Sequence, residues 1–211
     1  MIKTILFDLD GTLIQTTDII LDTLKLTFEK FFPEVTLSET ELTDLLGQTI
    51  FKTFGHHTDS EEKINEVVAY YREVSDFKLE TGLKAYPGAL ETMIYLKKKG
   101  CKIGVVTSKM RKIANDHLSR THLIDWIDGL IGYEDVINHK PDPEPIGKAL
   151  NLLGAKPNQT VYVGDHENDI MAAKKAGVLT CAVTYSHRLR EMLSLQPDFV
   201  IDELNHLKDI V

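Results

Sequence analysis

The chain has 211 residues, of which 43% are hydrophobic and 27% are charged, and this composition is ordinary for one globular core or a core with a small insert. Its 24 basic and 32 acidic residues give a formal net charge of −8, which argues against nucleic acid or an anionic membrane as a partner. No apolar run approaches the about 20 residues of a membrane span, and acids interrupt the N-terminal run where a signal peptide would lie, so we expect a cytoplasmic protein.

The first predicted element is a strand at Thr4–Phe7, and it runs directly into Asp8-Leu9-Asp10-Gly11-Thr12. Open α/β sheets bind their ligands at the carboxyl ends of the strands, which is where these two acids would lie. Two acids separated by one residue repel each other unless a positive charge, most simply a metal ion, lies nearby. The structural alternative for this segment alone is a strand followed by an Asp-Gly turn.

The stretch from Gln15 to about Thr81 predicts helices only. Ser38-x-x-Glu41 and Asp59-x-x-Glu62 match capping boxes that would open a short helix and a long one. Apolar residues at helical spacing in the long helix predict its buried stripe, formed by Ile64, Val67, Val68, Tyr71, Val74 and Phe77.

After Gly88, helices alternate with short apolar strands. We expect these strands at Lys102–Val106, Gly129–Gly132, Thr160–Val163, Thr180–Val183 and Phe199–Ile201. This alternation predicts an α/β fold with a doubly wound parallel sheet, interrupted by an inserted α-helical cap. We therefore expect an α/β core of residues 1–14 and 83–211 and a helical cap of residues 15–82, which would lie over the carboxyl edge of the sheet as a lid.

Polar residues also follow the later strands. They are Thr107-Ser108, Lys140, Asp165 and Asp169, and we expect them to meet Asp8 and Asp10 because parallel strands share one carboxyl edge. Such a set suits phosphoryl transfer. A divalent cation and a lysine offset the repulsion between an attacking carboxylate and a phosphoryl group, and a second acid can protonate the leaving oxygen. Taken singly, each residue has a structural alternative, namely a helix cap, a solvated loop lysine or a turn.

Together these motifs resemble the haloacid dehalogenase superfamily, in particular its phosphohydrolases with a helical cap after the first motif. The resemblance rests on Asp8–Thr12, Val106–Ser108, Lys140-Pro141 and Gly164–Asp169, which occur in the family's order. Within the superfamily the chain is similar to phosphoglycolate phosphatases and to a bacterial inorganic pyrophosphatase. The family's halide-displacing members lack an acid at the position of Asp10, so its presence favours phosphoryl transfer.

The resemblance implies a role for each motif. Asp8 would be the nucleophile and form an aspartyl-phosphate, Asp10 the general acid and base, and Lys140 the cation that neutralises the charge of the nucleophile and the phosphoryl group. Thr107, Ser108 and the backbone at Gly11 would bind the phosphoryl group. Mg²⁺ would be held by Asp8, the Asp10 carbonyl and Asp165, with Asp169 orienting this set.

The cap departs further from the family. Leu46-Gly47-Gln48-Thr49 lacks the proline that often follows the glycine there, so Gly47 and Gln48 are candidates for substrate contact, with a plain helix end as the alternative for Gly47. We expect a small phosphorylated metabolite as substrate, phosphoglycolate or pyrophosphate above others, and a monomer or weak homodimer. A phosphomutase on the same fold and a non-catalytic phosphate-binding module are the alternative functions.

Overall fold

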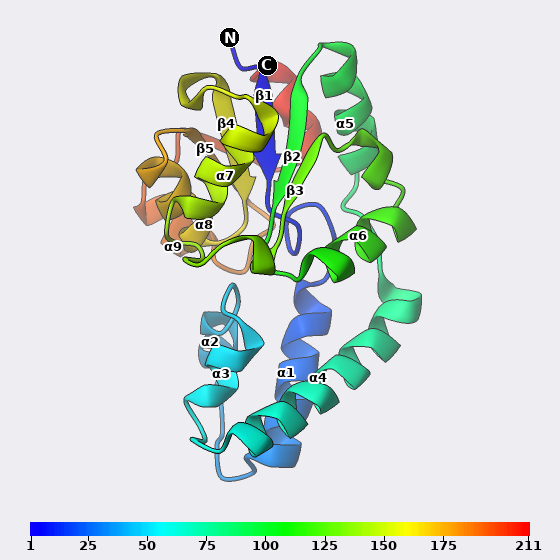
Figure 1. The fold of residues 1–211 in the computed structure, drawn as a ribbon, viewed down its shortest axis with the longest axis vertical. Helices are drawn as coiled ribbons and strands as arrows, with labels where there is room; N and C mark the ends of the chain where they lie inside the picture. Colours follow the sequence, from blue (N-terminus) through cyan, green and yellow to red (C-terminus); the bar gives the residue numbers. More distant parts are fainter. The chain divides into compact units, whose positions relative to one another are not determined.

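The computed structural model describes all 211 residues. The chain forms two compact units, one of residues Met1–Gln15 with Lys84–Val211 and the other of residues Thr16–Leu83. The first unit is an α/β core and the second is entirely helical (Figure 1).

The core is built on one six-stranded sheet in which every strand pair is parallel. The strand order is β3-β2-β1-β4-β5-β6, so β1 lies near the centre and the chain crosses over it. The strands are β1 (Thr4–Phe7), β2 (Lys102–Val106), β3 (Gly129–Ile131), β4 (Thr160–Gly164), β5 (Leu179–Val183) and β6 (Phe199–Ile201). The predicted α/β fold class with a parallel sheet is therefore confirmed.

Five helices and several 3-10 turns connect the strands. The helices are α5 (Ala89–Lys98), α6 (Arg111–Arg120), α7 (Glu144–Leu153), α8 (Glu167–Lys175) and α9 (Leu189–Ser194), and the last element is a 3-10 helix at Leu204–Asp209. On one side of the sheet, Leu6 and Tyr162 pack in one apolar cluster with Ile146 of α7 and Ala172 of α8. On its other flank, α5 packs against β2 and the C-terminal 3-10 helix. The connecting helices pack their apolar faces against the sheet. This packing holds the strands in place and so sets the level at which they end.

The register aligns the carboxyl ends of the central strands. Phe7 of β1 is level with Val105 of β2 and Val163 of β4, so the residues that follow these strands emerge at one edge. The two chain segments that join the units also lie side by side within the core, because Ile14 and Ala85 form an antiparallel bridge. The Gln15 N–H donates to the Lys84 carbonyl at 2.8 Å and the Tyr86 N–H to the Leu13 carbonyl at 2.9 Å.

The helical unit contains α1 (Thr17–Phe31), α2 (Glu39–Asp44), α3 (Ile50–Gly55) and α4 (Glu61–Gly82). Its own apolar core is formed by Leu24, Phe28, Phe32, Phe54, Val67, Val68 and Tyr71. The predicted capping box of α2 is present: the Ser38 backbone donates to Glu41 at 2.8 Å, and the Glu41 N–H to the Ser38 hydroxyl at 3.3 Å. None of the helices combines the length and apolar composition needed to cross a bilayer.

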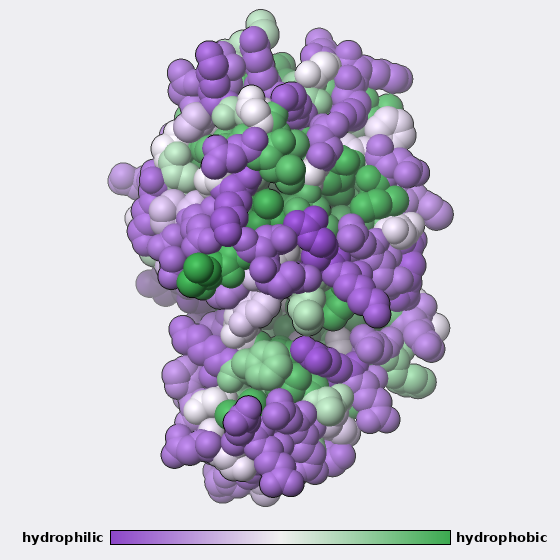
Figure 2. All heavy atoms as spheres, viewed as in Figure 1, coloured by the Kyte–Doolittle hydropathy of each residue, from purple (hydrophilic) through white to green (hydrophobic).

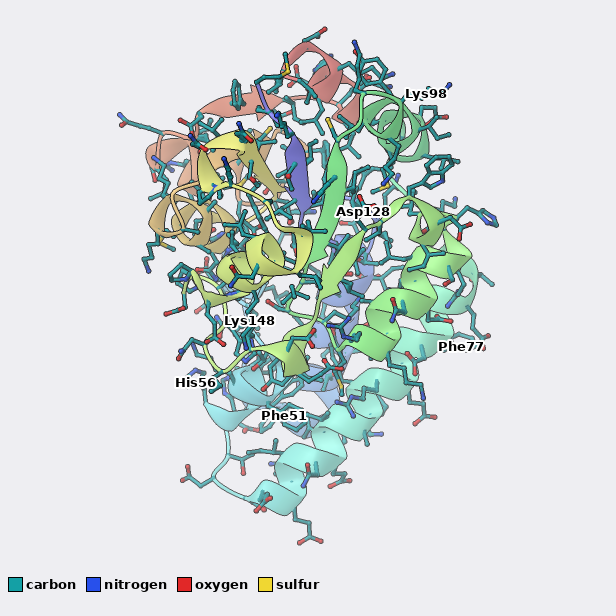
Figure 3. The ribbon with its side chains drawn as sticks, turned by 45° about the horizontal axis from the view of Figure 1, so that its top comes forward. Phe51, His56, Phe77, Lys98, Asp128 and Lys148 are labelled. Atoms are coloured by element: carbon teal, nitrogen blue, oxygen red, sulfur yellow. The ribbon has the colours of Figure 1, made fainter.

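Two expectations for α4 were wrong. The helix is capped by Ser60 rather than Asp59, because the Ser60 hydroxyl accepts the Lys63 N–H at 3.3 Å. Phe77 is 76% exposed and projects from the outer side of α4 (Figure 3). The buried face continues to Leu79, which is eight residues from Tyr71 and therefore on the same side of the helix, whereas Phe77 is not. On the face shown in Figure 2, hydrophilic side chains predominate and hydrophobic ones form separate patches.

Candidate active site

Asp8 leaves the carboxyl end of β1 in the centre of the sheet. Its N–H continues the strand ladder by donating to the Val163 carbonyl at 2.9 Å, and the residue is only 9% exposed. The chain then turns tightly: Leu13 N–H donates to the Leu9 carbonyl at 2.9 Å, and Gly11 adopts a φ of 76° that other residues rarely adopt. The turn leaves Asp10 half-buried at the same edge.

Lys140 bridges Asp8, which directly follows β1, and Asp169 in the first turn of α8. Its ammonium lies 2.9 Å from Asp8 Oδ1 and 2.7 Å from Asp169 Oδ1, and it also donates to Tyr162 Oη at 3.1 Å and to the Val106 carbonyl at 3.3 Å. Its side chain is 7% exposed, so it is not the solvated loop lysine of the structural alternative. Although burial alone lowers the pKa of the Lys140 ammonium, Asp169 and Asp8 raise it well above its usual value.

Three carboxylates gather beside this one ammonium. Oxygens of Asp8, Asp165 and Asp169 all lie within 4.8 Å of one another. Burial raises the pKa of Asp8 to about 7, with Asp169 adding to the rise and Lys140 opposing it. Burial, with the charges of Asp8 and Asp169, also raises the pKa of Asp165 well above its usual value. If all three acids were ionised, the cluster would carry more negative charge than Lys140 offsets, and a bound cation would relieve this repulsion.

Hydrogen bonds fix Asp165 on the β4–α8 loop and Asp169 in the first turn of α8. The Thr12 hydroxyl donates to Asp165 Oδ1 at 3.1 Å, and the His166 N–H donates to Asp169 Oδ2 at 3.1 Å. Gly164 is required for this packing, because a Cβ there would lie 2.4 Å from Asp169 Oδ2 and 2.5 Å from its Cβ. Both carboxylate oxygens of Asp169 thus accept hydrogen bonds from the chain itself.

Asp10 belongs to a separate polar group formed with the β2–α6 segment. Lys109 Nζ lies 2.7 Å from Asp10 Oδ1 and 3.2 Å from His117 Nδ1. Thr107 is buried and its hydroxyl accepts the Lys109 N–H at 3.1 Å, while Ser108 is half-buried. Thr107 does not cap α6, whose first flanking residue is Met110 and which has no side-chain cap.

Gly47 and Gln48 lie in the helical unit, in the turn after α2. Gly47 has a φ of 72°, as the structural alternative of a helix end requires, and Gln48 Nε2 donates to the Asp44 carbonyl at 2.9 Å. Substrate contact by these two residues stays a prediction.

The structure thus brings Asp8, Lys140, Asp165 and Asp169 into direct contact or near contact and places Asp10 and Thr107 together through Lys109. The sequence reasoning missed Lys109, His117 and Tyr162. Lys109 directly follows the Thr107-Ser108 motif, which is a signal that could have singled it out. The sequence predicts His117 in a helix and Tyr162 in a buried strand, and nothing in their spacing marks them as site residues.

The comparisons agree with this geometry. Residues 5–183 match the family described as haloacid dehalogenase-like hydrolase, and the chain belongs to this family of enzymes. It is therefore a hydrolase of the haloacid dehalogenase type, with the acidic cluster of a phosphohydrolase.

Within this family, the chain is similar over nearly its whole length to proteins named pyrophosphatase. The chain is 36% identical over 211 residues to pyrophosphatase PpaX of Halalkalibacterium halodurans, covering 100% of this chain and 97% of the relative. It is 37% identical to pyrophosphatase PpaX of Anoxybacillus flavithermus, with the same coverage of both chains.

Solved structures agree on the fold. A protein from Bacteroides fragilis assigned to the haloacid dehalogenase-like hydrolases has a TM-score of 0.87 at 28% identity, over 98% of this chain and 100% of that one. A protein from Haemophilus somnus that is predicted to be a phosphoglycolate phosphatase has a TM-score of 0.83 at 24% identity, over 99% of this chain and 97% of that one. The second likeness, at this identity, bears on the fold alone.

Proposed function

We propose that this chain is a magnesium-dependent phosphohydrolase that hydrolyses inorganic pyrophosphate, with phosphoglycolate as the second candidate substrate, through a phosphoryl group carried on Asp8. The observation that carries the chemistry is the buried Lys140 ammonium between Asp8 and Asp169, beside Asp165. The choice of pyrophosphate is supported by the full-length relatives named pyrophosphatase.

The donor set fits Mg²⁺. Hard oxygen ligands are what this ion prefers, and the pKa values of Asp8 and Asp165 are raised in the structure by burial and by mutual repulsion that a dication would relieve. The Asp8 and Asp165 carboxylates and the Asp10 carbonyl would hold the ion, and Asp169, with both oxygens already accepting hydrogen bonds, would orient them. When bound, the ion would screen the charge between Asp8 and the phosphoryl group.

The residues of the chain can then divide the reaction into two steps. An Asp8 carboxylate oxygen attacks phosphorus, the bond from phosphorus to the leaving oxygen breaks, and Asp10 donates a proton to that oxygen. Asp10, now a carboxylate, takes a proton from water as the water oxygen attacks the phosphorus, which releases phosphate and restores Asp8. Thr107 and Ser108 would hold the phosphoryl oxygens, and Lys140 would offset their charge. The Gly11 N–H, which the resemblance also placed on the phosphoryl group, donates to the Ile14 carbonyl at 2.9 Å instead.

We also propose that residues 15–82 act as a cap domain that selects the substrate, with Gly47 and Gln48 as its contacts. Gln48 is held by the Asp44 carbonyl on a turn rather than within a helix, where loops often carry binding residues. A small cap domain favours a small phosphorylated metabolite over phosphoproteins or nucleic acids.

Phosphate release by the purified full chain tests these proposals. With Mg²⁺ present, we expect kcat/KM to be highest for pyrophosphate, then phosphoglycolate, above sugar phosphates and nucleotides, and excess chelator to abolish activity. Asp8→Asn keeps the shape of the side chain and is expected to lower turnover by several orders of magnitude without loss of fold. Full activity in chelator or in Asp8→Asn would contradict the mechanism.

Gln48→Ala should lower kcat/KM for the preferred substrate more than for an aryl phosphate, and equal losses on both substrates would exclude a role of Gln48 in substrate selection.

A further inference from the structure

Lys109 is a second, half-buried cation at this edge of the core, and the proposed mechanism gives it no role. It lies between β2 and α6, and its side chain is 16% exposed. Its ammonium contacts Asp10 Oδ1 at 2.7 Å on one side and His117 Nδ1 at 3.2 Å on the other. Two of its three donors are therefore committed to fixed partners.

His117 is the second contact of the Lys109 ammonium, beside Asp10. The residue is 2% exposed on the inner face of α6. Burial, reinforced by the charge of Lys109, lowers the pKa of His117 to about 4, so the ring is neutral. Its Nδ1 therefore accepts a hydrogen bond from the Lys109 ammonium. A buried neutral acceptor that faces an ammonium restricts where the flexible lysine can point, and here it points to Asp10.

The two lysines of the site contact different acids. Lys140 contacts Asp8, which would carry the transferred phosphoryl group, whereas Lys109 contacts Asp10, which would protonate the leaving oxygen. A leaving oxygen hydrogen-bonded to Asp10 would lie within about 5–6 Å of the Lys109 ammonium, the reach of two successive hydrogen bonds. At that distance a cation attracts an anionic leaving group and interacts much less with a neutral one.

We propose that Lys109, positioned by His117, is a specificity residue that makes the enzyme prefer leaving groups carrying negative charge, such as the phosphate released from pyrophosphate or the carboxylate of glycolate. This inference rests on the proposed function, in which Asp10 faces the leaving group. Lys109 would also supply a local attraction for anionic substrates, which the net charge of −8 does not supply.

Substrate pairs that differ in leaving-group charge test the proposal. The ratio of kcat/KM for phosphoglycolate to that for ethyl phosphate should fall about 10- to 100-fold in Lys109→Met, the size expected for the loss of one charge–charge attraction over that distance, and should be largely kept in Lys109→Arg. An equal fall on both substrates would overturn the proposal, because a lysine that only supports the fold or orients Asp10 does not sense leaving-group charge. Thermal unfolding of each variant checks that the fold is intact.

The same ratio measured for 3-carboxyphenyl phosphate against phenyl phosphate separates this inference from the proposed substrates. A wild-type enzyme that hydrolyses neither pyrophosphate nor phosphoglycolate would refute the substrate proposal, while the aryl pair would still show whether Lys109 selects charge. His117→Leu should lower the ratio in the direction of Lys109→Met, and His117→Asn, which keeps an acceptor near the place of Nδ1, should restore it. An unchanged ratio in His117→Leu would show that His117 does not position Lys109.

A binding measurement gives a readout without turnover. In the Asp8→Asn background, adding Lys109→Met should weaken pyrophosphate binding by about 10-fold or more and leave phenyl phosphate binding nearly unchanged. Equal weakening of both ligands would contradict the charge preference.

Discussion

Asp8 and Asp10 are two residues apart, yet their surroundings differ. The Asp8 side chain is 12% exposed and contacts Lys140, whereas the Asp10 side chain is 20% exposed and contacts Lys109. A nucleophile benefits from a fixed, dehydrated position, and a group that exchanges protons with water needs access to it. This difference supports the division of roles proposed for the two acids.

Removing Asp10 should therefore change how the rate depends on the leaving group. Asp10→Ala is expected to lower turnover by about 10²–10⁴-fold, because both protonation of the leaving oxygen and activation of water are lost. Across aryl phosphates whose leaving groups differ in pKa, the mutant rate should rise more steeply as the leaving group becomes more acidic, and acid quench should show accumulated phosphoenzyme with the best leaving groups. Asp8→Asn is the control and should show no phosphoenzyme. A slope equal to that of wild type would exclude Asp10 as the acid.

At the scale of single residues, the sequence predicts where the acids lie better than what contacts them. Parallel strands share a carboxyl edge, so Asp8, Lys140, Asp165 and Asp169 could be expected near one another from that shared edge alone. Their catalytic and metal-binding roles stay predictions. The contact of Lys109 with His117 depends instead on how α6 packs and which rotamers its side chains adopt. No periodicity in the sequence encodes that.

Among the elements, the segment after β5 supports both acidic loops. Tyr185 Oη donates to the Thr12 carbonyl at 2.8 Å, and the Ser186 hydroxyl donates to the Asp165 carbonyl. Thr12 in turn donates to Asp165 Oδ1 at 3.1 Å, which closes a ring of hydrogen bonds around the proposed metal ligand. The segment itself is held by Arg188, whose guanidinium binds Glu167 at 2.6 Å and 3.1 Å.

Tyr185→Phe should weaken metal binding through this ring. The variant loses only one hydroxyl and keeps the stacking on Tyr86, whose ring centroid lies 4.2 Å away. One net hydrogen bond corresponds to about 0.5–1.5 kcal/mol, so we expect Mg²⁺ affinity to fall by roughly 2- to 13-fold in calorimetric titration of the full chain. Tyr70→Phe, in α4 of the helical unit, is the matched control and should bind Mg²⁺ as wild type does. An unchanged affinity in Tyr185→Phe would show that the ring does not orient Asp165.

Element types follow from the sequence more closely than element boundaries do. The alternation of apolar runs was sufficient for the α/β class because a parallel sheet needs a crossover between its strands. The start of α4 was misplaced because Asp59 and Ser60 are both good caps, and only the backbone path selects Ser60. Steps of three residues lead from Tyr71 through Val74 to Phe77, which is why the spacing predicts Phe77 on the buried stripe. Each such step falls about 60° short of a full helical turn, so Phe77 lies off the buried face.

For the molecule as a whole, the two units have separate apolar cores, but the charged cluster lies entirely in the α/β core. Three buried acids against one lysine lower the stability of that core wherever the acids are ionised and no cation is bound. The cluster therefore links the stability of the core to pH and to Mg²⁺.

This linkage has a definite sign. The pKa of Asp8 is raised from 3.8 to about 7 in the folded chain, so between these values the folded state binds a proton that the unfolded state has released. In chelator, the free energy of unfolding should therefore fall as pH rises toward 7, and the raised pKa of Asp165 acts in the same direction. Mg²⁺ binds the ionised carboxylates and should restore stability most where they are ionised.

The measurement is the thermal unfolding midpoint at pH 5 and pH 8, in chelator and in Mg²⁺. Saturation at about 100 times Kd adds about 2.7 kcal/mol, which for a chain of this length corresponds to an upward shift of roughly 5–10 °C at pH 8, and the shift should be much smaller at pH 5. Asp8→Asn removes one titrating acid while leaving every other ionisable group in place, so the pH dependence of its midpoint in chelator should be weaker than that of wild type. A metal-induced shift that is equal at the two pH values, or larger at pH 5, would show that the acids of the cluster are ionised in the metal-free fold and would contradict the raised pKa of Asp8.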